Sequence, residues 1–195
     1  MQVIKLGGSL SKSQSLSDCL KKIADNANAT ETTVIVPGGG DFADQVRLAQ
    51  QQWQFNDVIA HEMAILAMQQ MALVFKGLQP QFILSHTLAE IKQNLPHATP
   101  IIWSPTIAEL NQAGVCASWE ITSDSLAAWL ATQLAANKLT LVKAAPVATC
   151  NLAQLSQQGI IDSAFAGFVA HATFSIHILN QERFYEQSEF NREIV

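Results

Sequence analysis

Two lysines, one aspartate and two glycine loops carry the chemistry that this sequence suggests. Lys5 stands two residues before Gly7-Gly8, and a second loop is Gly38-Gly39-Gly40. Glycine has no Cβ, so the backbone amides of such a loop can approach a bulky anion closely. Each loop follows a predicted strand and precedes a predicted helix, whose first N–H groups are unpaired. Strand, glycine loop and helix together typically bind phosphate.

The strand-end lysines and Asp124 suit the transfer of a phosphoryl group. An ammonium at the end of a buried strand needs an anionic partner, and a phosphate held by the adjacent loop would supply one. The alternative for Lys5 is a side chain that reaches solvent past the sheet edge. Lys143 ends a later strand in the same way, and Asp124 lies between the two lysines in sequence. Phosphoryl transfer depends mainly on positioning and charge neutralisation, which such groups provide.

Several of these residues have a second, structural interpretation. Asp124 is expected in the first turn of a helix, where the dipole stabilises its charge, so it either caps that helix or holds a lysine or a metal-bound water. The Ser9 hydroxyl either donates to phosphate or caps the next helix. His61 is a candidate substrate contact from a long helix, whereas the other histidines are expected to be structural or at the surface.

Common catalytic motifs are absent from the sequence. Neither glycine loop has the spacing of a P-loop or of a dinucleotide-binding fingerprint. His61-Glu62 is followed by Ile65 where a zinc protease would need histidine, and the five histidines show no metal-ligand spacing. No serine lies in a GxSxG motif. We therefore predict no metal site built by the protein itself.

Predicted strands and helices alternate along the chain. Apolar runs indicate strands at 1–6, 32–37, 81–84, 101–103, 139–143 and 174–179. Helical spacing indicates helices at 16–28, 41–52, 56–75, 88–94, 123–136 and 151–158, with Gly77 ending the third. This order predicts an α/β fold, a mainly parallel sheet covered by helices on both faces, in one domain over 1–195. Ligands of such sheets bind beyond the carboxyl ends of the strands.

Composition narrows the possible partners. Only 14% of the 195 residues are charged and 49% are hydrophobic, so we expect part of the surface to be covered in a homodimer or higher homo-oligomer, best through helix 56–75. The net charge of −5 argues against nucleic acid as the main partner. No unbroken apolar run approaches the roughly 20 residues of a membrane helix, and no signal peptide is recognisable. The isolated Cys19, Cys116 and Cys150 are expected to be buried or partly buried thiols of a cytoplasmic protein.

Three motifs resemble the amino acid kinase superfamily, which includes acetylglutamate, aspartate, uridylate and isopentenyl phosphate kinases. They are Lys5-Leu6-Gly7-Gly8-Ser9, Pro37-Gly38-Gly39-Gly40-Asp41-Phe42-Ala43 and Ile121-Thr122-Ser123-Asp124-Ser125-Leu126-Ala127, in this order. The stretch 61–68 is similar to the archaeal-type kinases of methanofuran biosynthesis, which phosphorylate an (aminomethyl)furan methyl phosphate, and to their relatives in methylotrophic bacteria. The resemblance covers roughly residues 1–165.

The resemblance implies a three-layer αβα sandwich that uses ATP and Mg²⁺. Lys5, Asp124 and Lys143 would be catalytic, and Gly7, Gly8 and Ser9 would bind the transferring phosphate. The acceptor would be a small phosphate or carboxylate compound, contacted by Gly38, Gly39, Gly40, His61, Thr122 and Ser123.

The second half of the chain departs from the family pattern. Where relatives carry an Asp-Gly pair after the 139–143 strand, this chain has Ala144-Ala145-Pro146. It has no lysine after Lys143, and the later Gly-Thr pair of relatives does not occur. Two hypotheses follow: an ATP-dependent kinase of methanofuran-type cofactor synthesis, or a binding protein or complex subunit that has kept the fold and lost its ATP site.

Overall fold

Six parallel strands form a sheet in the order β3-β4-β2-β1-β5-β6 in the described part of the chain. The structure is a computed structural model that describes residues 1–27, 31–147 and 151–186. The central strands β1, β2 and β5 are buried along their whole length, as expected for a sheet covered on both faces. The strands are β1 (Gln2–Leu6), β2 (Thr33–Pro37), β3 (Ile83–Ser85), β4 (Ile101–Trp103), β5 (Lys138–Lys143) and β6 (Ser175–Asn180).

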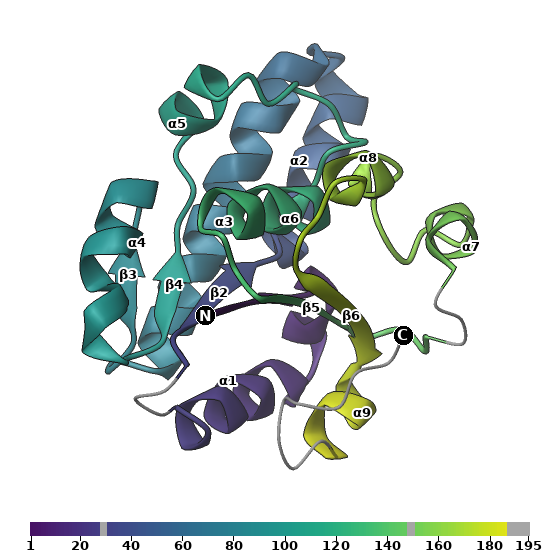
Figure 1. Cartoon of the computed structure of the whole chain (residues 1–195). Helices are drawn as coiled ribbons and strands as arrows, with labels where there is room; N and C mark the ends of the chain where they lie inside the picture. Colours follow the sequence, from purple (N-terminus) through teal and green to yellow (C-terminus); the bar gives the residue numbers. More distant parts are fainter. Residues whose placement is uncertain (28–30, 148–150, 187–195) are drawn as a thin grey trace.

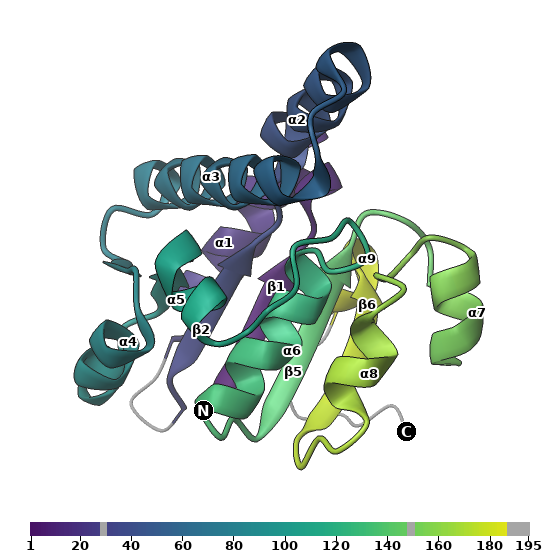
Figure 2. The ribbon, with the colours of Figure 1, turned by 90° about the horizontal axis from the view of Figure 1, so that it is seen from above.

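Helices cover both faces of this sheet, which gives three layers (Figure 1). On one face α6 packs on β1 and β5, with α8 beside α6; α1 and α9 lie on the opposite face (Figure 2). The long helix α3 contributes to the cores of both faces, with Ile65 in one and Phe75 in the other. The helices are α1 (Ser15–Asp25), α2 (Gly40–Trp53), α3 (Asp57–Leu78), α4 (Leu88–Asn94), α5 (Ile107–Gln112), α6 (Ser123–Gln133), α7 (Leu152–Gln157), α8 (Phe165–Val169) and α9 (Gln181–Glu186), and the short 3-10 helices are η1 (Gly8–Lys12) and η2 (Leu95–His97).

Strand register brings the candidate residues to one edge of the sheet. Leu6 lies opposite both Pro37 of β2 and Val142 of β5. The two glycine loops and the end of β5 therefore leave the sheet side by side. Side chains alternate between the faces of a strand, and Lys5 and Lys143 share the face that bears Val3, Leu139 and Leu141, which α6 covers.

The predicted α/β class is confirmed, and the strands are wholly parallel where we predicted a mainly parallel sheet. Some boundaries were wrong. Gly77 does not end α3, which runs to Leu78, because a glycine without positive φ is tolerated in an exposed helical turn. Helix α6 ends at Gln133, where Ala135 then adopts a left-handed φ of 49°. The first glycine loop leads into η1 before α1 begins, and α5, α8 and α9 were not predicted.

The apolar side chains of the long helix α3 are divided between core and surface. Met71 is buried, but Val58, Ile59, Leu66 and Val74 are exposed, because α3 packs inward through its small and sulfur-containing residues such as Ala67, Met68 and Ala72. By length and hydropathy, α3 is a candidate membrane span, and its inner side is packed in the core.

Among the cysteines, Cys19 is buried as predicted and Cys116 is exposed, contrary to the prediction, because it lies on the surface loop between α5 and α6. Cys150 lies outside the described residues.

Candidate active site

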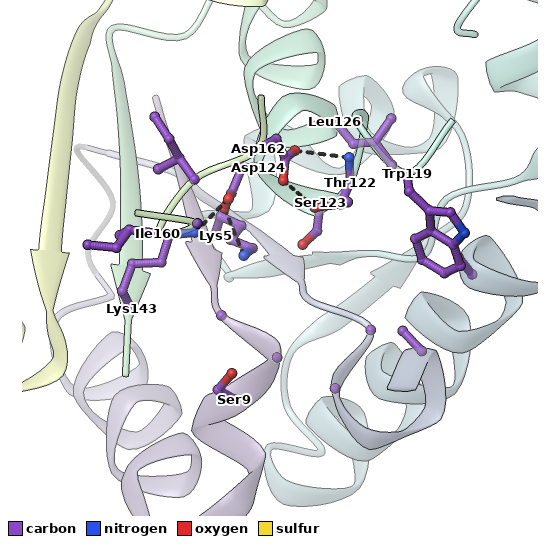
Figure 3. A pocket seen from close by; sticks show the side chains of 18 of the residues that line it. Lys5, Ser9, Trp119, Thr122, Ser123, Asp124, Leu126, Lys143, Ile160 and Asp162 are labelled. Carbon is purple, nitrogen blue, oxygen red and sulfur yellow. Dashed lines mark hydrogen bonds and ion pairs between the residues drawn. The ribbon is translucent and has the colours of Figure 1, made fainter. Parts of the chain in front are cut away.

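A cavity of about 550 Å³ opens at the carboxyl edge of the sheet. Strand ends form its floor, the two glycine loops and the start of α2 form one side, and the segment 158–163 forms the other. The pocket lies where ligands of parallel sheets bind. Figure 3 shows Lys5 and Lys143 joined to Asp124 by dashed lines, with Ser9 and Trp119 drawn further from it. Both loops and the end of β5 lie at this edge, where ligands of a parallel sheet are expected to bind.

Asp124 lies between the two strand-end lysines. Lys5 Nζ is 2.8 Å from Asp124 Oδ1, and Lys143 Nζ donates to Oδ2 at 2.5 Å. All three side chains are at least nine-tenths buried, with relative exposures of 5%, 4% and 10% for Lys5, Asp124 and Lys143. Lys5 is on a central strand and does not reach solvent past the sheet edge, so the alternative interpretation of this lysine is wrong.

This cluster carries one positive charge in excess when both lysines are charged. Burial by itself would raise the pKa of Asp124, but the ammonium groups of Lys5 and Lys143 outweigh it and lower that pKa to about 2. Burial and the nearby Lys5 charge lower the pKa of Lys143 to about 8, against the attraction of Asp124. One carboxylate cannot neutralise two buried ammonium groups. The site therefore favours further negative charge, to which the Asp162 carboxylate contributes weakly at Lys143.

The glycine loops contact each other through their backbones. A Cβ on Gly8 would lie 2.5 Å from the Gly40 nitrogen, and one on Gly38 would lie 2.4 Å from the Gly8 nitrogen. Glycine is therefore needed at Gly8 and Gly38 for loop packing, independently of any ligand. Gly7, Gly8, Gly39 and Gly40 line the cavity, but Gly38 is buried behind them and does not.

Helix α6 presents Thr122, Ser123 and Asp124 to the cavity, all of which line it. Thr122 is the N-cap residue but makes no side-chain cap; its hydroxyl donates to Asp162 instead. Ser9 also lines the cavity, is exposed, and makes no N-cap bond to η1. Asp162 was missed by the sequence analysis, because it is far from α6 in sequence and belongs to no motif.

Residues of α2, of α3 and of the loop before α6 complete the wall on the side of the glycine loops. His61 is buried and lines the cavity; burial lowers its pKa, against a backbone hydrogen bond to Ser118 that raises it. The Arg47 guanidinium lies 4.1 Å from the Trp119 ring centroid, and Trp119 Nε1 donates to Gln50 Oε1 at 2.6 Å. These contacts hold an aromatic ring and a cation at the cavity wall. No sequence motif indicated that Arg47 and Trp119 would contact each other.

A family model describes most of the chain. The model of the amino acid kinase family matches residues 1–151. This chain belongs to the amino acid kinase family. Its cluster of lysines and aspartate therefore lies in a kinase fold, at the edge of the sheet where the three motifs of the resemblance meet.

Similar proteins agree with this assignment. The [5-(aminomethyl)furan-3-yl]methyl phosphate kinase of Methanocaldococcus jannaschii is 31% identical over 132 residues, which are 67% of this chain and 59% of that kinase. The chain thus spans about three fifths of that relative's length.

Solved structures support the fold. The uridylate kinase of Archaeoglobus fulgidus superimposes with a TM-score of 0.68 at 14% identity, over 94% of this chain and 93% of that one. The UMP kinase of Bacillus anthracis gives 0.67 at 16% identity, over 93% and 87%. At such identities these likenesses establish the fold of this family member and not its substrate.

Proposed function

We propose that this chain transfers a phosphoryl group from ATP to a small phosphorylated metabolite. The observation that carries the proposal is Asp124 bridging two buried lysines at the point where two glycine loops leave the sheet. Fixed positive charge in a site shielded from water stabilises the negative charge of a phosphoryl group in transfer. With ATP as donor, we place the reaction in the cytoplasm.

The residues present fit the phosphates of a nucleotide. Lys5, Lys143 and the backbone amides of the loop at Gly7-Gly8-Ser9 would hold the transferring group, while Asp124 keeps both ammonium groups in place. Bound ATP supplies the phosphoryl group itself. Asp124 and Asp162, the carboxylates beside this cluster, are already engaged with lysines and with α6. Mg²⁺ would therefore be held chiefly by phosphates and water, as is common for this ion.

For the acceptor we propose the chemical class of the M. jannaschii relative's substrate, and hence a step of methanofuran-type one-carbon cofactor synthesis. The name of that substrate specifies a phosphate, a furan ring and an amine. The cavity wall offers a group for each: the Arg47 cation, the Trp119 ring and the Asp44 carboxylate, which is 3.7 Å from Arg47. His61, Thr122 and Ser123 complete this side of the pocket.

A coupled assay of ADP release tests this proposal. The purified protein receives ATP, Mg²⁺ and the (aminomethyl)furan methyl phosphate, with UMP as a comparison acceptor. We expect turnover with the furan compound and loss of it in Lys5→Ala. The absence of turnover together with the absence of ATP binding in calorimetry would overturn the proposal.

A second candidate is a binding protein that has lost its ATP site. It is favoured by Ala144 and Ala145, which line the cavity where relatives are expected to carry Asp-Gly, and by Pro146, which lacks a backbone donor. Under this hypothesis the protein binds the phosphorylated metabolite with an affinity that ATP does not change, and copurifies with another enzyme. If ATP weakened or strengthened the binding of the metabolite, this hypothesis would be contradicted.

A second copy of this chain is the partner that we propose for the outer side of α3. Within the described residues, the exposed large hydrophobic side chains all belong to α2 or α3. Ile59, Leu66 and Leu73 follow one another at intervals of seven residues and so form one stripe. A two-fold axis at Leu66 would place Ile59 of one copy beside Leu73 of the other, the self-complementarity that an isologous interface needs.

Cysteine cross-linking tests this axis. With Cys116 and Cys150 replaced by serine, Leu66→Cys is expected to form a disulfide-linked dimer, whereas Ile59→Cys forms one only when mixed with Leu73→Cys. In sedimentation, Leu66→Glu should be monomeric, while Gln154→Glu, an exposed change on α7, should associate as the wild type does. A monomeric wild type would overturn the proposed interface.

A further inference from the structure

Asp162 joins the segment between α7 and α8 to the first turn of α6. Its carboxylate accepts hydrogen bonds from the Thr122 backbone nitrogen at 2.9 Å, from the Ser125 nitrogen at 2.8 Å and from the Thr122 hydroxyl. Figure 3 shows Asp162 directly above the Asp124 cluster, with dashed lines to α6. Both of its carboxylate oxygens are engaged with α6.

This carboxylate caps α6 from outside the helix. The first N–H groups of a helix have no partners within it, and an N-cap side chain usually supplies one. Thr122 makes no such cap, and Asp162 takes its place from 37 to 40 residues further along the chain. A second link lies beside it, because the Ala164 nitrogen donates to the Glu120 carbonyl at 3.2 Å. The chain before and after Thr122 is therefore fixed to the same segment.

The fixed turn carries Asp124. This residue lies between Thr122 and Ser125, whose nitrogens both donate to Asp162. A rotation of the first turn would move the Asp124 carboxylate away from Lys5 or Lys143, to which it makes contacts of 2.8 and 2.5 Å. Asp124 is the only acidic group among the three side chains of that cluster, so its position decides whether both ammonium groups stay in place.

Asp162 also contributes to the charge of the cluster. The charged groups that face Lys143 are Lys5 from β1, Asp124 from α6 and Asp162 from the segment 158–163. Burial and Lys5 lower the pKa of Lys143, while Asp124 and, more weakly, Asp162 raise it. Loss of the Asp162 charge should therefore lower the pKa of Lys143 further.

We propose that Asp162 is a positioning residue: it fixes the first turn of α6 so that Asp124 spans Lys5 and Lys143, and it thereby ties the segment 158–163 to the site of phosphoryl transfer. That segment lines the far side of the cavity from the glycine loops. Asp162 is the link of this wall that reaches the turn carrying Asp124, beside the backbone link from the Ala164 nitrogen to the Glu120 carbonyl. The kinetic part of the proposal rests on the proposed kinase function; the structural part does not.

Three variants separate positioning from simple stabilisation. Asp162→Ala removes all three hydrogen bonds, and Asp162→Asn removes the charge while keeping one acceptor oxygen. Thr87→Ala is the matched control, because Thr87 caps α4 by accepting from the Glu90 nitrogen at 3.2 Å, outside the cavity. For Asp162→Ala we expect kcat to fall about tenfold to a hundredfold, as for other displaced catalytic groups, with KM for the acceptor nearly unchanged. Thr87→Ala should lower Tm only.

A second measurement does not require activity. In protein labelled with ¹³C-lysine, the Lys143 resonance is assigned with Lys143→Arg and followed by NMR as a function of pH. Its titration should move to lower pH in Asp162→Asn and stay unchanged in Thr87→Ala. An unmoved titration, with kinetics that match the control, would overturn the proposal. If the Lys143 titration moves in Asp162→Asn but the wild type shows no turnover, the result would support positioning by Asp162 and contradict the kinase function.

Discussion

On one side of the cavity the glycine loops touch backbone to backbone, whereas on the other side the segment 158–163 is held to α6 by the side chain of Asp162. The first arrangement leaves no room for even one added methyl group at Gly8 or Gly38. The second includes three hydrogen bonds to one carboxylate, together with the Ala164 backbone link and the buried Ile161 side chain.

This difference would account for the departure from the family pattern that we expect at Ala144-Ala145-Pro146. A site built from packed backbones constrains the residue type at each glycine, so its motif stays visible in sequence. The opposite wall is held partly by side chains, those of Asp162 and the buried Ile161, so its other residues can change without disturbing the glycine loops. The loop side and the Asp162 side of the pocket can therefore be tested separately.

The largest effect is expected from the lysine that faces the glycine loops. Lys5→Met keeps an apolar stem of similar length but removes the charge, and we expect kcat to fall by about 10²- to 10³-fold, as when one stabilising group of a transition state is lost. The protein should remain folded, because Asp124 keeps Lys143 as its partner. Steady-state kinetics and circular dichroism measure the two effects.

An exposed lysine supplies the control for this change. Lys92→Met, on α4 and outside the cavity, should leave kcat unchanged. Removal of Lys5 should also raise the pKa of Lys143, because it removes the repulsion that lowers it. If Lys5→Met turned over at the wild-type rate, the cluster would not be the site of phosphoryl transfer.

The next largest effect is the loss of stability when a tightly packed glycine is replaced, in comparison with a glycine that has open space around it. Gly8→Ala is expected to destabilise the fold by about 1–3 kcal/mol, the usual range for overpacking, since its Cβ would lie 2.5 Å from the Gly40 nitrogen. Gly77→Ala should be neutral or stabilising by up to about 1 kcal/mol, because no atom lies within 4 Å of the added Cβ in α3. Urea unfolding gives both values. Equal effects of the two substitutions would show that the loops do not pack as described.

The pH dependence should separate activity from stability. The pKa of Lys143 is about 8 in the folded protein against an ordinary 10.5, so the unfolded chain binds more protons between these values. Stability from this group therefore rises as pH increases from 8 to 10.5, while activity that needs the charged lysine falls. Urea unfolding and kinetics at about pH 7, 9 and 10 would show stability rising and activity falling as this lysine loses its proton. In Lys143→Met the rise in stability should diminish.

The parts of this molecule that depend on local sequence patterns could be predicted from the sequence. Apolar runs located all six strands, and the alternation with helices implied the parallel sheet that places Lys5 beside Lys143. Short helices such as α8, with five residues, have too few turns to show a period. Asp162 and Trp119 were not found, because their partners lie 37 to 69 residues away and depend on how the loops fold.

The smallest effect is expected at Ser9, which lies on the loop side yet is not packed into it. Its side chain is exposed and makes no N-cap bond to η1, so Ser9→Ala should change stability by less than about 0.5 kcal/mol, as for other surface substitutions. If the hydroxyl donates to bound phosphate, KM for ATP should still rise, because a hydrogen bond to a charged group contributes about 1.5–3 kcal/mol. Unchanged kinetics would show that this loop holds phosphate through its backbone amides and not through Ser9. The loop side would then use its backbone both for packing and for binding the ligand.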